Sequence, residues 1–188
     1  MGVILNLTKE YFGELQRDED KFVTNIDEMK EINLGKSFPL IFADRDLIIN
    51  GQDRFDWFYV ESVLDKIKKT GWDLPPYEEF NSMFYKTTYP HIKKDNIKSE
   101  WIPYEGGIIE TTESNEKLIF RAKNKQYGDT YWCGTDEDLS NSKNARCFDM
   151  GDTSYEVIVV TNNQDKNKMC KIRLVKHKFP DEDFSNNL

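Results

Sequence analysis

The second half of the sequence constrains the fold most, because it alternates short strand-like segments with turns. Segments rich in β-branched and aromatic residues recur between residues 107 and 176: GIIETT, KLIFRA, TYWCG, ARCFDM, YEVIVVT and MCKIRLVK. The stretches between them, among them TESNE, KNKQYGD, MGDTS and NNQDKNK, have the composition of turns. Short strands joined by turns are typical of antiparallel sheets, so we expect a twisted antiparallel sheet in this half.

The first half predicts helices. In DWFYVESVLDKIKKTG the apolar residues recur at intervals of three and four, as they do on one face of a helix. Asp56 can cap the start of this helix, and Gly71 can end it. A second helix is expected after Pro75 and Pro76, because proline suits the first helical turn. Its apolar face would hold Tyr77, Phe80, Met83 and Phe84.

Two other stretches are expected to lack helix. Residues 32–50 indicate two short strands, with Gly35 and Pro39 as breaks and the DRD triplet at 44–46 as a turn. Residues 86–107 are expected to form a long loop with aromatic anchors.

Charge and hydropathy exclude several partners. The chain has 26 basic and 34 acidic residues and a net charge of -8, which opposes binding to nucleic acid or to an anionic membrane. No segment approaches the roughly 18 consecutive apolar residues of a membrane span. The opening stretch MGVILNLTKEYF lacks the basic start of a secretory signal peptide, so we expect synthesis in the cytoplasm without one.

The cysteines do not suggest chemistry. Cys133, Cys147 and Cys170 form no CxxC pair and no Cys/His cluster with zinc-site spacing, so we predict no disulfide framework, no metal site and no cofactor. Cys133 follows Trp132 in YWCGT, but no basic residue adjoins it that would lower its pKa, and we expect it in the core. The sequence has no Ser-His-Asp set, P-loop, GxGxxG or HExxH motif, so no catalytic residue is predicted.

Three separated stretches resemble one known family. DWFYVESVLDKIKKTGWDLPPYEEF is similar to the helix and G-W-x-L-P motif of the Fibrobacter-type paralogous domains of bacteria. INLGKSFPLIFADRDL is similar to the L-G-L-P-S-G opening of their Bacteroides-type members. The stretch from KLIFRA to ARCFDM, with MCKIRLVK after it, is similar to their Y-W-S-S-T, N-A-x-x-[FL] and closing V-R strands. The resemblance spans roughly residues 30–176.

The resemblance implies a fold and a division of the chain. These domains resemble C-type lectins, as do variable proteins of phages and retroelements, so the implied class is α+β and C-type-lectin-like. Two helices would pack on a twisted antiparallel sheet with long loops. We expect an N-terminal arm or helix for assembly or docking at residues 1–29, the lectin-like domain at 30–178 and a polar C-terminal tail at 179–188.

Two chemistries of related proteins do not carry over well. The sequence lacks the E-P-N or Q-P-D and W-N-D triplets of calcium-dependent lectins, so the resemblance implies no calcium site. Asp136, Glu137 and Asp138 could hold a hard cation, but a solvated loop is the favoured interpretation. Formylglycine-generating enzymes use a pair of cysteines whose spacing is absent here, so an enzyme of that type is the weakest alternative.

With no catalytic motif found and no calcium site implied, the function left to consider is the presentation of loops that bind a partner. A rigid sheet concentrates binding residues on its loops, so we predict a non-catalytic recognition or structural module. Short polar side chains with one Arg and one aromatic suit hydrogen bonding to a glycan or a protein surface, although ordinary soluble turns have the same composition. The ligand-binding candidates are Asp136, Asp138, Asn141, Asn144, Arg146, Asp152, Ser154 and Tyr155.

Two settings for such a module remain open. The absence of a signal-peptide pattern and of a disulfide framework favours a phage virion component, such as a head-decoration, fibre or tail protein, with protein assembly partners or copies of itself. The alternative is a bacterial glycan-binding lectin-like domain that acts as a monomer.

Overall fold

The computed structural model describes residues 22–36, 38–77, 96–134, 143–153 and 156–178, without the side chains of residues 152–162. Its helical elements are η1 (Ile26–Glu28) and α2 (Trp57–Lys68). Its strands are β1 (Glu31–Asn33), β2 (Leu40–Ala43), β3 (Ile97–Ile102), β4 (Gly106–Thr111), β5 (Lys117–Arg121), β6 (Tyr127–Trp132), β7 (Asn144–Thr153), β8 (Glu156–Asp165) and β9 (Val175–His177).

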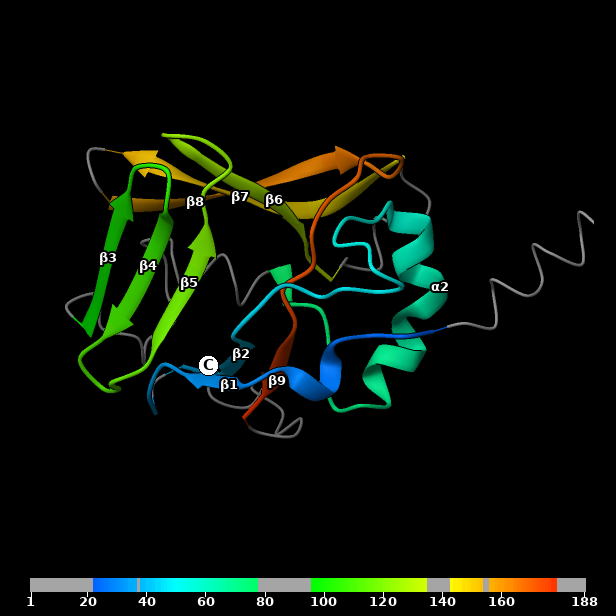
Figure 1. Ribbon diagram of the computed structural model, residues 1–188, viewed down its shortest axis with the longest axis horizontal. Coiled ribbons are helices and arrows are strands. Elements are labelled where there is room, and N and C mark those ends of the chain that lie inside the picture. The colour runs from blue at the N-terminus through cyan, green and yellow to red at the C-terminus, as the bar shows by residue number, and fades with distance from the viewer. Residues whose placement is uncertain (1–21, 37, 78–95, 135–142, 154–155, 179–188) are drawn as a thin grey trace, which may run out of the picture.

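The strands form three antiparallel sheets of three strands each, in the orders β1-β2-β9, β3-β4-β5 and β6-β7-β8. In Figure 1 the β3-β4-β5 sheet stands at the left, the β6-β7-β8 sheet lies along the top, and the β1-β2-β9 sheet lies below. Helix α2 closes the opposite side of the molecule. The three sheets therefore surround the middle of the molecule.

The fold class expected from the sequence is wrong. The strands do not build one twisted sheet covered by two helices, because they are divided among three small sheets, and α2 is the one α-helix of the described part. The second expected helix falls almost wholly on residues 78–84, which lie outside the described residues. The division arises from long-range pairing, since β9, at the end of the second half of the chain, pairs with β2 in the first half.

Helix α2 confirms the prediction from its local signals. The Asp56 carboxylate accepts a hydrogen bond from the Tyr59 amide at 2.8 Å, so it caps the helix as expected. Gly71 lies just beyond the end with a positive φ of 83°. The buried stripe of the helix consists of Trp57, Val60, Val63 and Ile67.

The strand positions are mostly correct, but several expected boundaries differ from the structure. The two short strands expected within residues 32–50 are β1 and β2, and the DRD triplet follows β2 as a bend. The expected loop at 86–107 contains β3, because Ile97, Ser99 and Trp101 alternate inward against β4. The expected turns KNKQYGD, MGDTS and NNQDKNK lie partly within β6, β7 and β8, because these strands extend beyond their apolar segments. The expected strand MCKIRLVK is wrong for most of its length, since only its end belongs to β9.

Two hydrophobic clusters fill the spaces between the layers. One packs α2 against Trp132, Ile172 and Leu174, and the other packs the β3-β4-β5 and β6-β7-β8 sheets around Phe120 and Phe148. The aromatic rings meet directly, with the centroids of Trp57 and Trp132 5.5 Å apart and nearly edge to face. All four tryptophans are buried: Trp57, Trp72, Trp101 and Trp132.

Residues 170–175, which we call the central segment, join these layers. The segment runs extended between β6 on one side and the chain around residues 43–55 on the other. Its main-chain hydrogen bonds, each 2.8–3.0 Å long, reach Ala43, Leu47, Phe55, Asp73, Thr130 and Trp132. Cys170, Ile172 and Leu174 face the cluster beneath α2, so Lys171 and Arg173 point to the other side.

Candidate functional site

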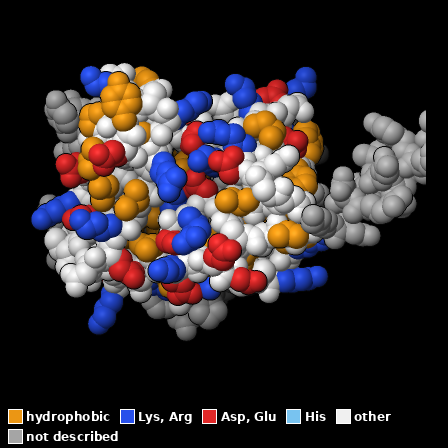
Figure 2. All heavy atoms as spheres, in the orientation of Figure 1, with side chains coloured by type: hydrophobic (Ala, Val, Ile, Leu, Met, Phe, Trp, Pro, Cys, Tyr) orange, Lys and Arg blue, Asp and Glu red, His pale blue; other side chains and the backbone are white. Residues whose placement is uncertain are grey.

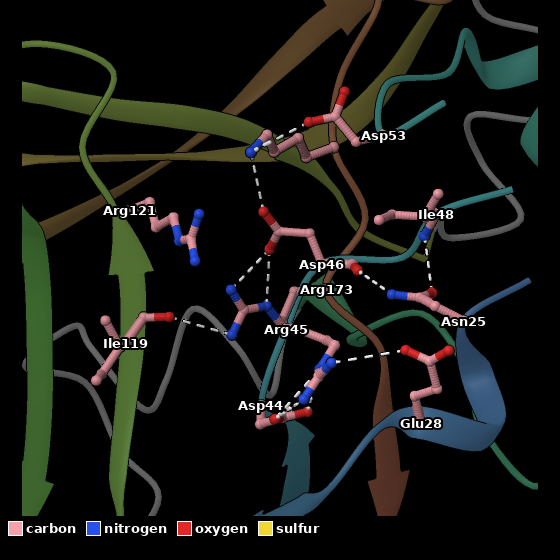
Figure 3. Close-up of a pocket in the computed structure, with 11 residues that line it drawn as sticks. Asn25, Glu28, Asp44, Arg45, Asp46, Ile48, Asp53, Ile119, Arg121 and Arg173 are labelled. Carbon is pink, nitrogen blue, oxygen red and sulfur yellow. Dashed lines mark hydrogen bonds and ion pairs between the residues drawn. The ribbon is translucent and has the colours of Figure 1, made fainter. Parts of the chain in front are cut away.

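The candidate site is a hollow of about 580 Å³ on the side of the central segment opposite α2, which we call the junction pocket. It lies between β5, the chain after β2 and the central segment (Figure 3). Its lining is Asn25, Glu28, Asp44, Arg45, Asp46, Ile48, Asp53, Ile119, Arg121, Lys171 and Arg173. Figure 2 shows acidic and basic side chains intermixed over the middle of this face.

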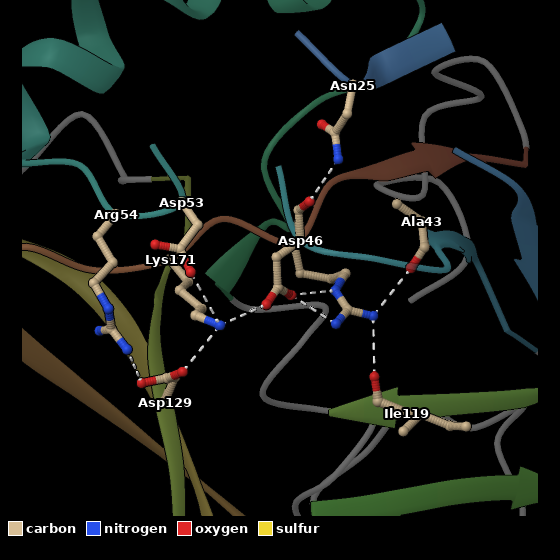
Figure 4. Close-up of polar contacts among 9 residues, drawn as sticks. Asn25, Ala43, Asp46, Asp53, Arg54, Ile119, Asp129 and Lys171 are labelled. Atoms are coloured by element: carbon tan, nitrogen blue, oxygen red, sulfur yellow. Dashed lines mark hydrogen bonds and ion pairs between the residues drawn. The ribbon is translucent and has the colours of Figure 1, made fainter. Parts of the chain in front are cut away.

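Asp46 is the acceptor at the floor of the pocket (Figure 4). Its Oδ1 accepts from Arg173 Nε at 3.0 Å and from Arg173 Nη2 at 2.6 Å, and its Oδ2 accepts from Lys171 Nζ at 3.0 Å. Asn25 fixes the backbone here, because its Nδ2 donates to the Asp46 carbonyl and its Oδ1 accepts from the Ile48 amide. The central segment therefore holds the carboxylate in one orientation, and Asn25 holds its backbone.

Lys171 lies at the centre of the ion pairs at the pocket floor. Its Nζ lies 3.0 Å from Asp46, 3.1 Å from Asp129 and 3.5 Å from Asp53, while only 11% of its side chain is exposed. Asp129 also forms an ion pair with Arg54. A buried ammonium group is tolerated only when anions compensate its lost hydration, and here three carboxylates do so.

A β-bulge brings Asp129 into this network. The register between β6 and β7 shifts between Tyr127 and Thr130, so β6 has one residue more than its partner over this stretch. Such bulges redirect side chains at one point of a strand. Asp129 lies within the bulge and only 7% of its side chain is exposed.

The shifts in pKa follow from these contacts. Burial would raise the pKa of Asp129, but the hydrogen bonds from Arg54 and Lys171 outweigh it and lower that pKa. Burial would lower the pKa of Lys171, but Asp46 and Asp129 outweigh it and raise that pKa. The hydrogen bond with Asp129 raises the pKa of Arg54. The shifts of Asp129, Lys171 and Arg54 therefore all favour the charged forms of these three side chains.

Tyr131 lies beneath the network. Burial and the charge of Asp46 raise the pKa of its hydroxyl, which has no hydrogen-bond partner among the described residues. Its ring stacks on Phe148 at 5.0 Å between centroids. The phenol therefore stays neutral, and it belongs to the hydrophobic cluster rather than to the ion pairs.

Arg45 and Arg121 differ in how they are held at the rim. Arg45 forms an ion pair with Asp44 at 2.9 Å and lies 3.8 Å from Glu28. Arg121 extends from the end of β5 toward the middle of the pocket, and no dashed contact reaches it in Figure 3. Within the described residues, no hydrogen bond or ion pair engages its guanidinium. Of the cations that line the pocket, Arg121 is therefore the one with no hydrogen-bond or ion-pair partner for its side chain in the described part of the chain.

The arrangement suits binding by hydrogen bonds and charge. Carboxylates accept and guanidinium groups donate, so the lining offers both functions to a ligand. The described residues contain no group of three or more His, Cys, Asp or Glu side chains that could hold a metal ion. In the same part of the chain, no helix is long and apolar enough to cross a membrane.

The residues proposed from the sequence lie elsewhere. Asp136, Asp138, Asn141, Ser154 and Tyr155 fall outside the described residues, and Asp152 is described only as a backbone position in β7. Asn144 and Arg146 lie near the start of β7, and the structure brings these two together on one face. Six residues of strand separate Arg146 from Asp152, roughly 20 Å at about 3.3 Å per residue, so one small ligand does not span both.

Arg146 is already engaged within the protein. Its guanidinium lies over the Tyr77 ring at 4.2 Å, and its Nη1 donates to Asn163 Oδ1 at 3.3 Å. This position ties β7 to β8 and to the chain after α2. Neither Arg146 nor Asn144 lines the junction pocket.

The prediction that Cys133 lies in the core is confirmed. Cys133, Cys147 and Cys170 are free thiols and are buried. Burial raises the pKa of Cys133 well above its ordinary value and raises that of Cys170 to about 12. Thiols in this state are poor nucleophiles, because the thiolate is the reactive form.

The pocket residues were missed because their partners are distant in sequence. Asp46 was interpreted as part of a turn, and Asp129 as the end of the turn KNKQYGD. One signal was present in CKIRLV, where Lys171 and Arg173 alternate with apolar residues and so share one face of an extended segment. That pattern indicates a charged face, and burial of that face depends on the acids that the fold supplies.

Comparisons of this chain with protein-family models, with curated proteins and with solved structures gave no match.

Proposed function

We propose that the protein is a non-catalytic recognition module that binds a saccharide in the junction pocket. The observation that supports this proposal is the rigid, charged hollow where the layers meet. Its volume of about 580 Å³ falls within the range of roughly 300–1,000 Å³ that small-ligand sites occupy. Saccharide hydroxyl groups both donate and accept hydrogen bonds, so they match a lining that mixes carboxylates with guanidinium groups.

Preorganisation supports binding rather than a purely structural role for the pocket. The Asp46 carboxylate and the Lys171 ammonium group are fixed by each other and by Arg173, so a ligand would not have to order them. Binding to groups that are already ordered avoids part of the entropic cost of association. Asp53 retains acceptor capacity, because its side chain is 52% exposed and meets Lys171 only at 3.5 Å.

The absence of activated groups in the described site supports recognition over catalysis. The charged side chains at the floor neutralise one another in ion pairs, and the described thiols are buried with raised pKa values. A catalytic acid, base or nucleophile would need a pKa near the working pH and access to the ligand.

A steric block tests the proposal. Ile119 lines the pocket with 47% of its surface exposed, so Ile119→Trp would fill the hollow while keeping a residue that strands accept. Phe58→Trp is the matched control, because Phe58 is 54% exposed on α2 and does not line the pocket. A glycan array identifies ligands of the wild type, and titration of the strongest one is then repeated with both variants.

We expect Ile119→Trp to abolish binding and Phe58→Trp to leave it unchanged. Equal binding by both folded variants would move the site away from this pocket. Absence of any saccharide ligand for the wild type would overturn the proposal.

Incorporation into a virion stays a prediction from the sequence. Its measurement is the mass of the native particle, by light scattering of the protein taken from its source. A large symmetric particle that contains the 22.2 kDa chain would support assembly, and a lone chain would contradict it.

A further inference from the structure

We infer that the ligand of the junction pocket is an acidic saccharide whose carboxylate binds Arg121. This inference rests on the proposed function and adds the charge of the ligand and the residue that binds the charged group. The argument starts from the balance of charges around the pocket.

The positive and negative charges at the floor of the pocket sum to zero. Lys171 and Arg173 share Asp46, Lys171 also meets Asp53 and Asp129, and Arg54 completes the set. The set contains three acids and three bases: Asp46, Asp53, Asp129, Lys171, Arg173 and Arg54. A ligand anion at the floor would therefore gain little from Lys171 or Arg173, whose charges are already neutralised.

The rim charges do not cancel locally. Arg45 is bracketed by Asp44 and Glu28, so that side of the rim has one acid in excess. Arg121 stands at the β5 side with no ion-pair partner among the described residues. The lining as a whole is neutral, with four acids and four bases, and among the described residues its unpaired positive charge is that of Arg121.

The strand fixes where Arg121 points. In β5 the residues alternate exposed and buried, with Leu118 and Phe120 in the core and Ile119 and Arg121 on the pocket side. The backbone at this end is held by pairing with Gly106 of β4. The guanidinium is thus presented from a strand, and only its side-chain torsions have to adjust on binding.

The chemistry of this position favours a carboxylate. A guanidinium offers parallel N–H donors that match the two oxygens of a carboxylate. A single carboxylate pairs one to one with the guanidinium of Arg121, whereas a phosphate with a charge of about -1.5 to -2 would place more negative charge beside Asp44 and Asp53. Asp53 lines the same pocket, and its exposed carboxylate can accept from hydroxyl groups of the same sugar.

The test compares two trisaccharides that differ only in the terminal residue, glucuronate in one and glucose in the other. Titration calorimetry with the wild type should give at least about tenfold tighter binding of the glucuronate form, since a charge-assisted hydrogen bond contributes roughly 1.5–3 kcal/mol. The preference should shrink as salt is added, because Arg121 is exposed.

Two variants assign the preference to a residue. Arg121→Gln should remove the preference for glucuronate, so that the two trisaccharides bind this variant with equal affinity. Lys117→Gln is the matched control, because Lys117 lies on the same exposed face of β5, forms an ion pair with Glu110 and does not line the pocket. It should keep the wild-type preference.

The outcomes separate this inference from the proposed function. Equal binding of both trisaccharides by the wild type would overturn the role of Arg121 and leave saccharide recognition standing. A preference that survives in folded Arg121→Gln would also overturn it. Binding of an acidic peptide in place of either sugar would overturn the assigned ligand class, and binding of neither sugar nor any glycan would overturn the proposed function itself.

Discussion

The Nη1 atom of Arg173 donates a hydrogen bond to the backbone carbonyl of Ile119 at 3.2 Å, and so joins the central segment to the edge strand of the β3-β4-β5 sheet. The same Nη1 donates to the Ala43 carbonyl at the end of β2. One buried side chain therefore links parts of two sheets and orients Asp46. The stability of the fold should depend on it.

Replacement of Arg173 by Met should lower the free energy of unfolding by about 3–5 kcal/mol, because it leaves part of a buried ion network uncompensated. Urea denaturation measures this change. Lys176→Met is the control, since Lys176 forms a half-exposed pair with Glu31 and should cost less than about 1 kcal/mol. Similar losses in the two variants would contradict the role given to Arg173. If Arg173→Met does not fold, Arg173→Lys, which keeps the charge, should recover a folded protein.

Stability should fall in acid through Asp129. Its folded pKa lies below the reference value of 3.8, so its contribution is fully present above pH 3.8 and is lost as the pH falls through the folded pKa. Urea midpoints measured at a series of pH values should therefore drop below pH 3.8. Asp129→Asn should be less stable at neutral pH and should show a shallower acid drop. An unchanged acid slope in this variant would show that other carboxylates cause the drop.

The three thiols should not react with a thiol reagent in the native protein. Cys133, Cys147 and Cys170 are buried and their pKa values are raised, so an aromatic disulfide reagent at pH 8 should release little colour within minutes. The same titration in denaturant should count three thiols per chain. Rapid reaction of one thiol in the folded protein would show that its site opens or that its pKa is not raised.

Gly106 should not tolerate a side chain. Its φ is 129°, and a Cβ at this position would lie 1.9 Å from the Phe120 carbonyl oxygen. Gly106→Ala should therefore cost about 3 kcal/mol or more in unfolding free energy. Gly71→Ala separates the two causes, because Gly71 has a positive φ of 83° with open space around it and should cost about 1 kcal/mol. Equal losses would mean that backbone strain alone sets the cost at Gly106.

The elements could be predicted where the signal is local. The capping residue Asp56 and the terminal Gly71 lie beside the helix they delimit, so the boundaries of α2 follow from the sequence. The alternation in KLIFR likewise defines β5. Both depend on interactions between residues a few positions apart.

The assembly of the elements could not be predicted in the same way. Leu40 pairs with His177, and Asp46 meets Arg173, so sheet composition and the pocket both depend on residues more than a hundred positions apart. An isolated sequence shows that Asp46 and Arg173 are charged, but a turn or an exposed strand face explains each of them separately. Only the fold shows that they neutralise one another.

The position of the central segment in the chain determines when the protein can fold during synthesis. Residues 170–175 supply the hydrogen bonds that connect β2, β6 and the chain near Phe55, and all of these emerge from the ribosome earlier. Until residue 175 is outside the exit tunnel, β2 lacks β9 as a partner, and Asp46 and Asp129 lack Lys171. The nascent chain must therefore keep one incomplete sheet and two unconnected sheets soluble until the segment that links them has emerged.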